Sequence, residues 1–102
     1  MKTIEIDATE WETVLDFYHA ILKAIGAPKG HGISIDALLD SMIWGGMNSV
    51  NAPYIIRVKN IRERPKAILL EIELLARCIS KARADFAARH GHEPDVRLEI
   101  AS

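Results

Sequence analysis

Three short strand-like runs, separated by helical stretches, limit the fold of this chain more than any other feature. They occupy residues 3–7, 53–58 and 96–100, and the first and last alternate apolar with charged residues. The middle run is apolar and rich in β-branched side chains, so we expect a strand that is buried on both faces or largely covered. Parallel neighbours can be joined only by a long crossover, and helical stretches fill both gaps. The order β-α-α-β-α-β therefore predicts a small α/β domain, with a three-stranded parallel sheet packed by helices.

The first and last helices have clear boundary signals. Thr9 and Glu12 have the spacing of a capping box, which places the start of the first helix at Thr9, and Gly26 is expected to end it. The last helix has the strongest three-and-four repeat of apolar residues in the chain. Pro65 is expected at its first position and Gly91 as its stop.

The short helix between them carries the candidate site. Ser34 is its expected N-cap, and Asp36 lies in the first turn, where the helix dipole favours a carboxylate. Asp40 follows four residues later, so the two like charges share one side of the helix, at a cost of only about 0.2–0.5 kcal/mol. On physics alone they could be two solvated acids. The apolar stripe expected to face the core is Ile35, Leu38, Leu39, Met42 and Ile43.

A short motif supports a functional interpretation. It runs in the order Gly32, Ser34, Asp36, Ala37, Leu38 and Asp40. This pattern resembles the barstar family of intracellular ribonuclease inhibitors. The resemblance implies a three-stranded parallel sheet, with the Asp-bearing helix and the loop before it as the inhibitory surface. It also implies a barstar-like protein-binding module of the antitoxin or immunity type, and not an enzyme. The partner would be a ribonuclease or another protein with a basic cleft.

Several positions differ from the family pattern. Gly30 and His31 stand where the family has aromatic residues before its glycine, and Leu39 stands where it has a tryptophan before the second aspartate. Ser34 replaces an asparagine cap. Aromatic anchors supply much of the energy of protein interfaces, so these differences predict a partner surface unlike that of the family's inhibitor.

Asp40 is the candidate phosphate mimic. A ribonuclease holds a phosphate with lysine, arginine or histidine, and a carboxylate pushed into that cleft takes the place of the phosphate and blocks access. Trp44 and Leu39 would add apolar contact, although Trp44 could equally be a cap over the core. The candidate partner-binding residues are Asp36, Asp40, His31, Gly32, Ser34, Leu39 and Trp44.

Two other classes of function stay open. Asp36, Asp40 and His31 could bind a divalent metal or act as acid and base, and His90 with His92 could chelate a metal weakly. Without the spacing of a known metal site, phosphate loop or nucleophile elbow, we expect no metal and no cofactor. An adaptor or a homodimer is the other alternative, if an apolar cluster beside two glycines is exposed. Its members are Met42, Ile43, Trp44 and Met47.

Composition narrows the remaining choices. The chain has 102 residues, enough for one core, so we expect residues 1–102 to form a single domain. A net charge of −1 with interspersed signs argues against direct nucleic-acid binding. We find no signal peptide or membrane span, and expect a cytoplasmic protein without a membrane partner. Cys78 is the single cysteine and is expected to serve packing.

Overall fold

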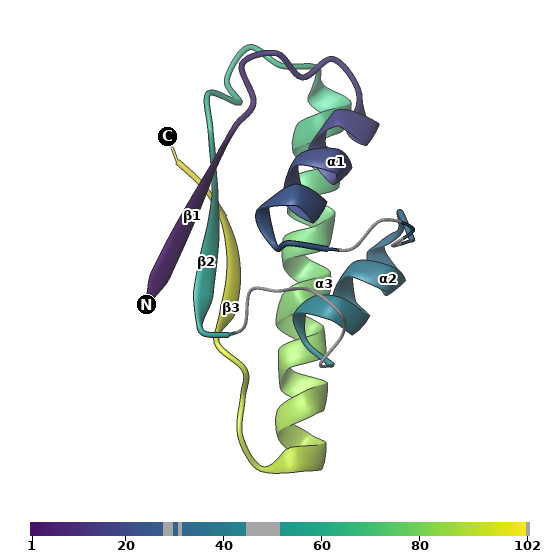
Figure 1. Ribbon diagram of the computed structural model, residues 1–102, viewed down its shortest axis with the longest axis vertical. Helices are drawn as coiled ribbons and strands as arrows, with labels where there is room; N and C mark the ends of the chain where they lie inside the picture. The colour runs from purple at the N-terminus through teal and green to yellow at the C-terminus, as the bar shows by residue number, and fades with distance from the viewer. Residues whose placement is uncertain (28–29, 31, 45–51, 102) are drawn as a thin grey trace.

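In residues 1–27, 30, 32–44 and 52–101, which the computed structural model describes, three strands form one parallel sheet (Figure 1). They are β1 (Lys2–Asp7), β2 (Tyr54–Lys59) and β3 (Val96–Ile100). Their order in space is β1-β2-β3, with Ile4 opposite Ile56 and Ile56 opposite Leu98. For this part of the chain, the predicted parallel sheet and the order β-α-α-β-α-β are confirmed.

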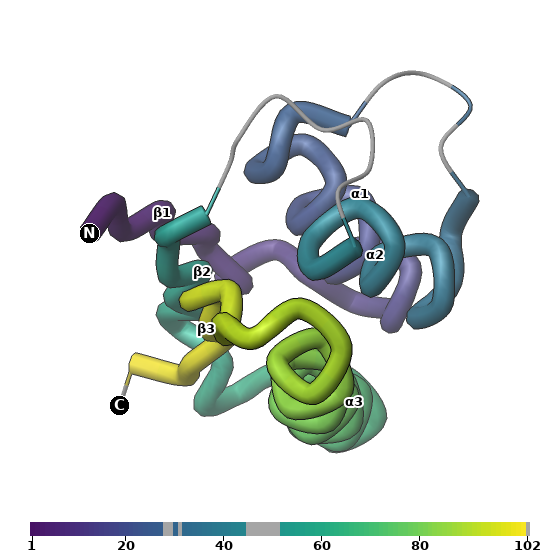
Figure 2. Tube along the Cα trace, turned by 90° about the horizontal axis from the view of Figure 1, so that it is seen from below, coloured from purple at the N-terminus to yellow at the C-terminus, as the bar shows by residue number. Residues whose placement is uncertain are grey.

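The helices of the described chain are α1 (Val14–Ala24), α2 (Ile35–Met42) and α3 (Lys66–His90), and they cover the same face of the sheet (Figures 1 and 2). Crossovers between parallel strands are right-handed in nearly all proteins. Two crossovers that advance in the same direction across a sheet therefore place their helices on one side. Of the two expectations for β2, burial on both faces is not met, and a largely covered strand is. Its residues alternate between fully buried and half-buried, from Tyr54 to Lys59.

Charges alternate across the open face of the sheet. Glu5, Arg57 and Glu99 are neighbours in register on β1, β2 and β3. The Nε and Nη2 atoms of Arg57 donate to Oε1 of Glu99 at 2.9 and 2.7 Å. Opposite charges on neighbouring strands stabilise a sheet modestly. Because these three side chains are charged, this face of the sheet can be exposed to water without a layer of helices over it.

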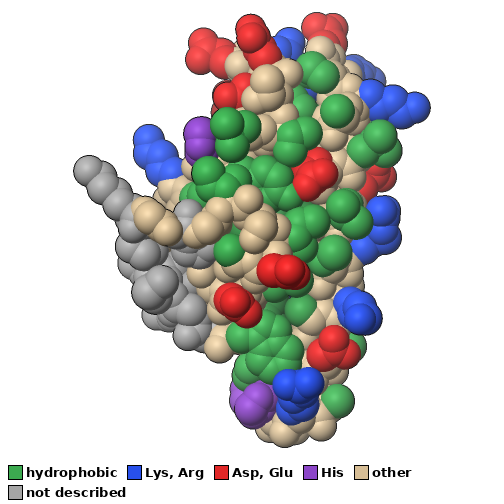
Figure 3. All heavy atoms as spheres, turned by 90° about the vertical axis from the view of Figure 1, so that its right-hand side faces the viewer, with side chains coloured by type: hydrophobic (Ala, Val, Ile, Leu, Met, Phe, Trp, Pro, Cys, Tyr) green, Lys and Arg blue, Asp and Glu red, His purple; other side chains and the backbone are tan. Residues whose placement is uncertain are grey.

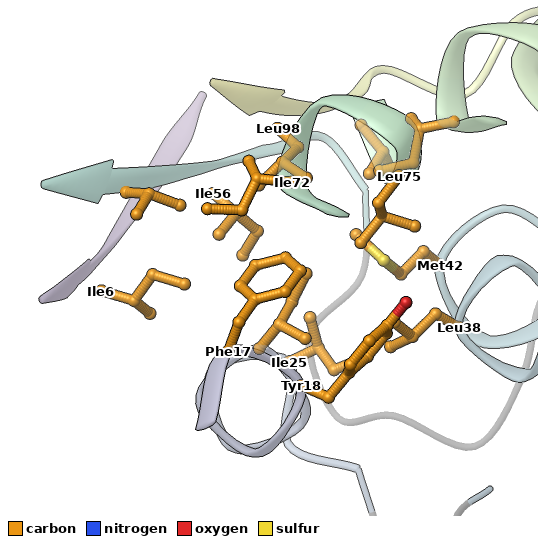
Figure 4. Packing of buried hydrophobic residues seen from close by; sticks show 14 of the residues in the cluster. Ile6, Phe17, Tyr18, Ile25, Leu38, Met42, Ile56, Ile72, Leu75 and Leu98 are labelled. Atoms are coloured by element: carbon orange, nitrogen blue, oxygen red, sulfur yellow. The ribbon is translucent and has the colours of Figure 1, made fainter. Parts of the chain in front are cut away.

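The core lies between the sheet and the helices (Figure 4). Phe17 of α1 and Ile72 of α3 point towards Ile56 of β2, and Leu38 and Met42 enter the same core from α2. These side chains are between 0% and 5% exposed. Truncating one of the fully buried residues to alanine typically costs about 2–5 kcal/mol.

The start of α1 differs from the prediction. Thr13 is the N-cap, and its hydroxyl accepts the amide of Asp16 at 3.4 Å. The carboxylate of Asp16 in turn accepts the amides of Glu12 and Thr13 at 2.8 and 3.0 Å, which completes a capping box. Thr9 lies outside the helix because its amide and hydroxyl both donate to Asp7.

The boundaries of α3 are close to those expected. Pro65 is the N-cap and not the first helical residue, so α3 begins at Lys66. Gly91 ends the helix as predicted, with a left-handed φ of 78° that glycine adopts without strain. Among the helices of the described residues, none is long and apolar enough to cross a membrane.

Asp7 fixes the turn that follows β2. Nδ2 of Asn60 donates to Oδ1 of Asp7 at 2.9 Å, and the amide of Thr9 donates to the same oxygen at 2.9 Å. Asn60 has a left-handed φ of 63°, which asparagine tolerates better than most residues. The hydrogen bonds from Asn60 and Thr9 lower the pKa of Asp7 from 3.8 to about 2.

Acid should therefore remove a stabilising contribution of Asp7. Because the folded-state pKa lies below the unfolded value of 3.8, this contribution is present above about pH 4 and is lost as the pH falls towards 2. We expect the free energy of unfolding of Asp7→Asn to fall less steeply than that of the wild type across this range. Urea unfolding at a series of pH values measures the difference. Glu10→Gln, at a nearby exposed acid, should keep the wild-type slope, and equal slopes for Asp7→Asn and wild type would refute the assignment.

Candidate functional site

The start of α2 is fixed by a cap and by a close contact. The hydroxyl of Ser34 accepts the amide of Ala37 at 3.1 Å, and Asp36 lies in the first turn, both as predicted. A Cβ atom added to Gly32 would lie 3.2 Å from Cβ of Ala37. Glycine therefore allows the chain before α2 to run tightly against the first turn.

The apolar stripe of α2 faces the core, as predicted. Leu38 is fully buried, and Met42 and Ile43 are 5% and 4% exposed. Ile35 and Leu39 are half-buried and pack against the same core. A helix of eight residues is not stable alone in water, so these contacts hold α2 in place.

Asp36 and Asp40 are exposed on the side of α2 away from the core. Their spacing places them on neighbouring turns of one helix face. In the part of the chain that the structure describes, neither carboxylate forms an ion pair with a lysine, arginine or histidine. Figure 3 views the molecule from the side of α2, where acidic side chains sit among hydrophobic ones. We call the exposed pair Asp36 and Asp40 the acidic face of α2.

Asp40 lies where a helix disfavours a carboxylate. It belongs to the last turn of α2, where the helix dipole favours a cation, and this turn has no basic residue. Repulsion between Asp40 and Asp36 adds about 0.2–0.5 kcal/mol against folding. The stability of α2 therefore gives no reason for an aspartate at this position.

Trp44 packs against the end of α3. Its ring centroid lies 5.2 Å from that of Phe86, and Cζ of Arg89 lies 5.4 Å from the Trp44 ring centroid. The ring of His90 is 6.2 Å away. Trp44 is half-buried, so it covers the edge of the core and also leaves part of its surface beside α2 open.

Sequence reasoning missed the partners of Trp44. The distance along the chain between Trp44 and Phe86 gives no local signal that the two rings meet. The spacing of Phe86, Arg89 and His90 does place them near one another at the end of α3, which is the one hint that the sequence contains. His90 and His92 both pack on Phe86, with centroid distances of 4.3 and 5.3 Å.

The structure bears on both alternative functions, a metal or acid–base site and a homodimer. In residues 1–27, 30, 32–44 and 52–101, no three histidine, cysteine, aspartate or glutamate side chains gather to hold a metal ion. His31 lies outside the described residues, so its place beside Asp36 and Asp40 stays a prediction. Met42 and Ile43 are buried, so they do not contribute to an exposed apolar cluster of the kind that a homodimer would need. Met47, its last member, lies outside the described residues.

Comparison with known families identifies one match. Residues 1–99 match the family described as Barstar (barnase inhibitor). The matched stretch runs from β1 into β3 and contains α1, α2 and α3. A search of curated proteins finds no match for the chain.

The position of Asp40 predicts that its removal does not weaken the fold. Asp40→Ala should change the free energy of unfolding by less than about 0.5 kcal/mol, or raise it slightly, because repulsion from Asp36 is relieved. Leu39→Ala should lower it, by less than the roughly 2–5 kcal/mol expected for a fully buried leucine such as Leu38. Urea unfolding of the purified variants gives both values. A loss above about 1 kcal/mol in Asp40→Ala would instead assign Asp40 a structural role.

Proposed function

This chain belongs to the barstar family, and from that premise we propose that it inhibits a ribonuclease with the acidic face of α2. The protein would act as an intracellular inhibitor of the antitoxin or immunity type, and not as an enzyme. The family description supports the general class, a barnase-inhibitor-like binding module. The position of Asp40 is the observation that carries the finer proposal.

Asp40 is exposed, without an ion-pair partner among the described residues, and unfavourably placed for α2 itself. Proteins commonly sacrifice local stability at positions that serve function. A carboxylate of this kind gains its partner only in a complex. The expected partner group is a cluster of lysine, arginine or histidine side chains.

The active-site cleft of a ribonuclease supplies such a cluster. Its cationic groups hold the phosphate of the RNA backbone, and a carboxylate that enters the cleft forms charge-assisted hydrogen bonds with the same donors. We assign Asp40 to this position, with Asp36 beside it one turn earlier. The inhibitor would then exclude RNA both by charge and by the bulk of α2.

The other candidate residues would act around this pair. Ser34 and Gly32 fix the start of α2, which sets the direction of Asp36 and Asp40. Leu39 and Trp44 are half-buried and could add apolar contact at the edge of the interface. His31, in the segment before α2, would complete the partner-binding surface.

The ribonuclease that this protein binds should differ from barnase in its contact surface. Gly30 replaces a family aromatic and has a left-handed φ of 85°, a conformation that side-chain-bearing residues rarely adopt. An aromatic anchor at Gly30 would therefore be strained in this loop. With Leu39 in place of a tryptophan as well, we propose a ribonuclease whose contact surface depends less on aromatic anchors.

Removal of the charge at Asp40 should weaken binding strongly without unfolding the protein. We expect Asp40→Asn to weaken binding to the ribonuclease by about 3–5 kcal/mol, because the enzyme's cations would stay buried without their partner. Asp36→Asn should have a smaller effect in the same direction. Wild-type protein captures the partner from its native lysate, and each captured protein is assayed for RNA cleavage with and without the inhibitor.

The control is Glu73→Gln, which removes a charge from an exposed position of α3. It should inhibit as the wild type does, and thermal unfolding should show that all variants are folded. Full inhibition by Asp40→Asn would exclude the proposed use of α2. Captured proteins that cleave no RNA would contradict the proposed partner class.

A further inference from the structure

A hollow lies at the carboxyl ends of β2 and β3, beside the beginning of α3. The carboxyl ends of these strands are at the upper end of the sheet in Figure 1, and the hollow has a volume of about 540 Å³. Pockets that bind small molecules usually have volumes of about 300–1,000 Å³. The size of this hollow therefore suits a small ligand.

The walls of the hollow are apolar and its rim is basic. Ile61, Leu69 and Ile100 are half-buried and line it from three different segments of the chain. Lys59 and Arg62 also line it, and none of the lining residues that the structure describes is acidic. Among the described residues, neither Lys59 nor Arg62 has a carboxylate within salt-bridge distance, although Lys59 interacts electrostatically with Asp7. An apolar wall beside these two cations is complementary to an amphipathic anion.

The turn that carries the cations is held in one conformation. Asn60 lies between Lys59 and Ile61, with the left-handed φ of 63° described above, and its side chain is bonded to Asp7. The hydrogen bond to Asp7 holds the side chain of Asn60 against the end of β1. A fixed turn also spares a ligand the entropy of ordering it.

We propose that this hollow binds a medium-chain carboxylate. The acyl chain would lie along Ile61, Leu69 and Ile100, and the carboxylate would pair with Lys59 and Arg62. Charge favours a single carboxylate over a neutral lipid, and the apolar walls favour a chain over a free inorganic anion. No residue of α2 lines the hollow, so this site is independent of the proposed ribonuclease interface.

Titration with decanoate tests the proposal on the full chain. We expect saturable binding in calorimetry, and amide chemical-shift changes confined to residues 59–62, 69 and 100–101. Arg62→Ala should weaken decanoate binding about tenfold, as expected for the loss of one charge-assisted hydrogen bond. Lys59→Ala should act in the same direction. Arg77→Ala, an exposed arginine of α3 that does not line the hollow, should bind decanoate as the wild type does.

Three other ligands separate the contributions. Decanol lacks the charge and butyrate lacks the long chain, so each should bind at least tenfold more weakly than decanoate. Adenosine monophosphate should also bind more weakly, and tighter binding of this ligand would overturn the carboxylate assignment in favour of a phosphate site. Absence of saturable decanoate binding would overturn the proposal, as would equal affinity for decanol or an unchanged affinity in Arg62→Ala. Inhibition of a ribonuclease is not part of this experiment, so its outcome does not depend on the function proposed for α2.

Discussion

Burial of Leu38 and Met42 is the contact on which the candidate site depends. α2 has eight residues and cannot persist alone in water, so its position is set by the face that it presents to the core. Figure 4 shows Met42 directed towards Leu75 of α3 and Leu38 beside Tyr18 of α1. The opposite face is thereby directed outwards, and Asp36 and Asp40 lie on it. The position of the acidic face is therefore set by the core that α2 packs on, and not by α2 itself.

Elements with strong local signals were predictable from the sequence. The cap of α2 at Ser34, the end of α3 at Gly91 and the parallel sheet all follow from patterns within a few residues or from the rule for crossovers. The start of α1 was not predictable in this way, because Thr9 and Thr13 each have an acidic residue three positions later. Asp7 decides which threonine caps α1, because it accepts hydrogen bonds from Thr9 and from Asn60, which is distant in the sequence. Thr9 is thereby held outside the helix.

Contacts between distant segments explain the other differences. On the open face of β2, Arg57 and Lys59 are charged but Ile55 is apolar, so apolar and polar residues alternate over only part of the strand. Trp44 meets Phe86 and Arg89 only because α2 packs on α3. The exposure of Asp36 and Asp40 could be predicted from helical spacing alone. Binding of these carboxylates by a partner depends on the partner's surface as well, and the sequence of this chain carries no information on that surface.

The strand order has a consequence for how the chain can assemble. The strands lie in space in the order in which they occur along the chain, and both pairs run parallel. No strand has to be inserted between two that are already paired, since β2 adds to the edge of β1 and β3 adds to the edge of β2. Each addition brings its own helices to the growing face. The sheet can therefore be built in the direction of synthesis, with β3 closing a core that the earlier segments have already begun.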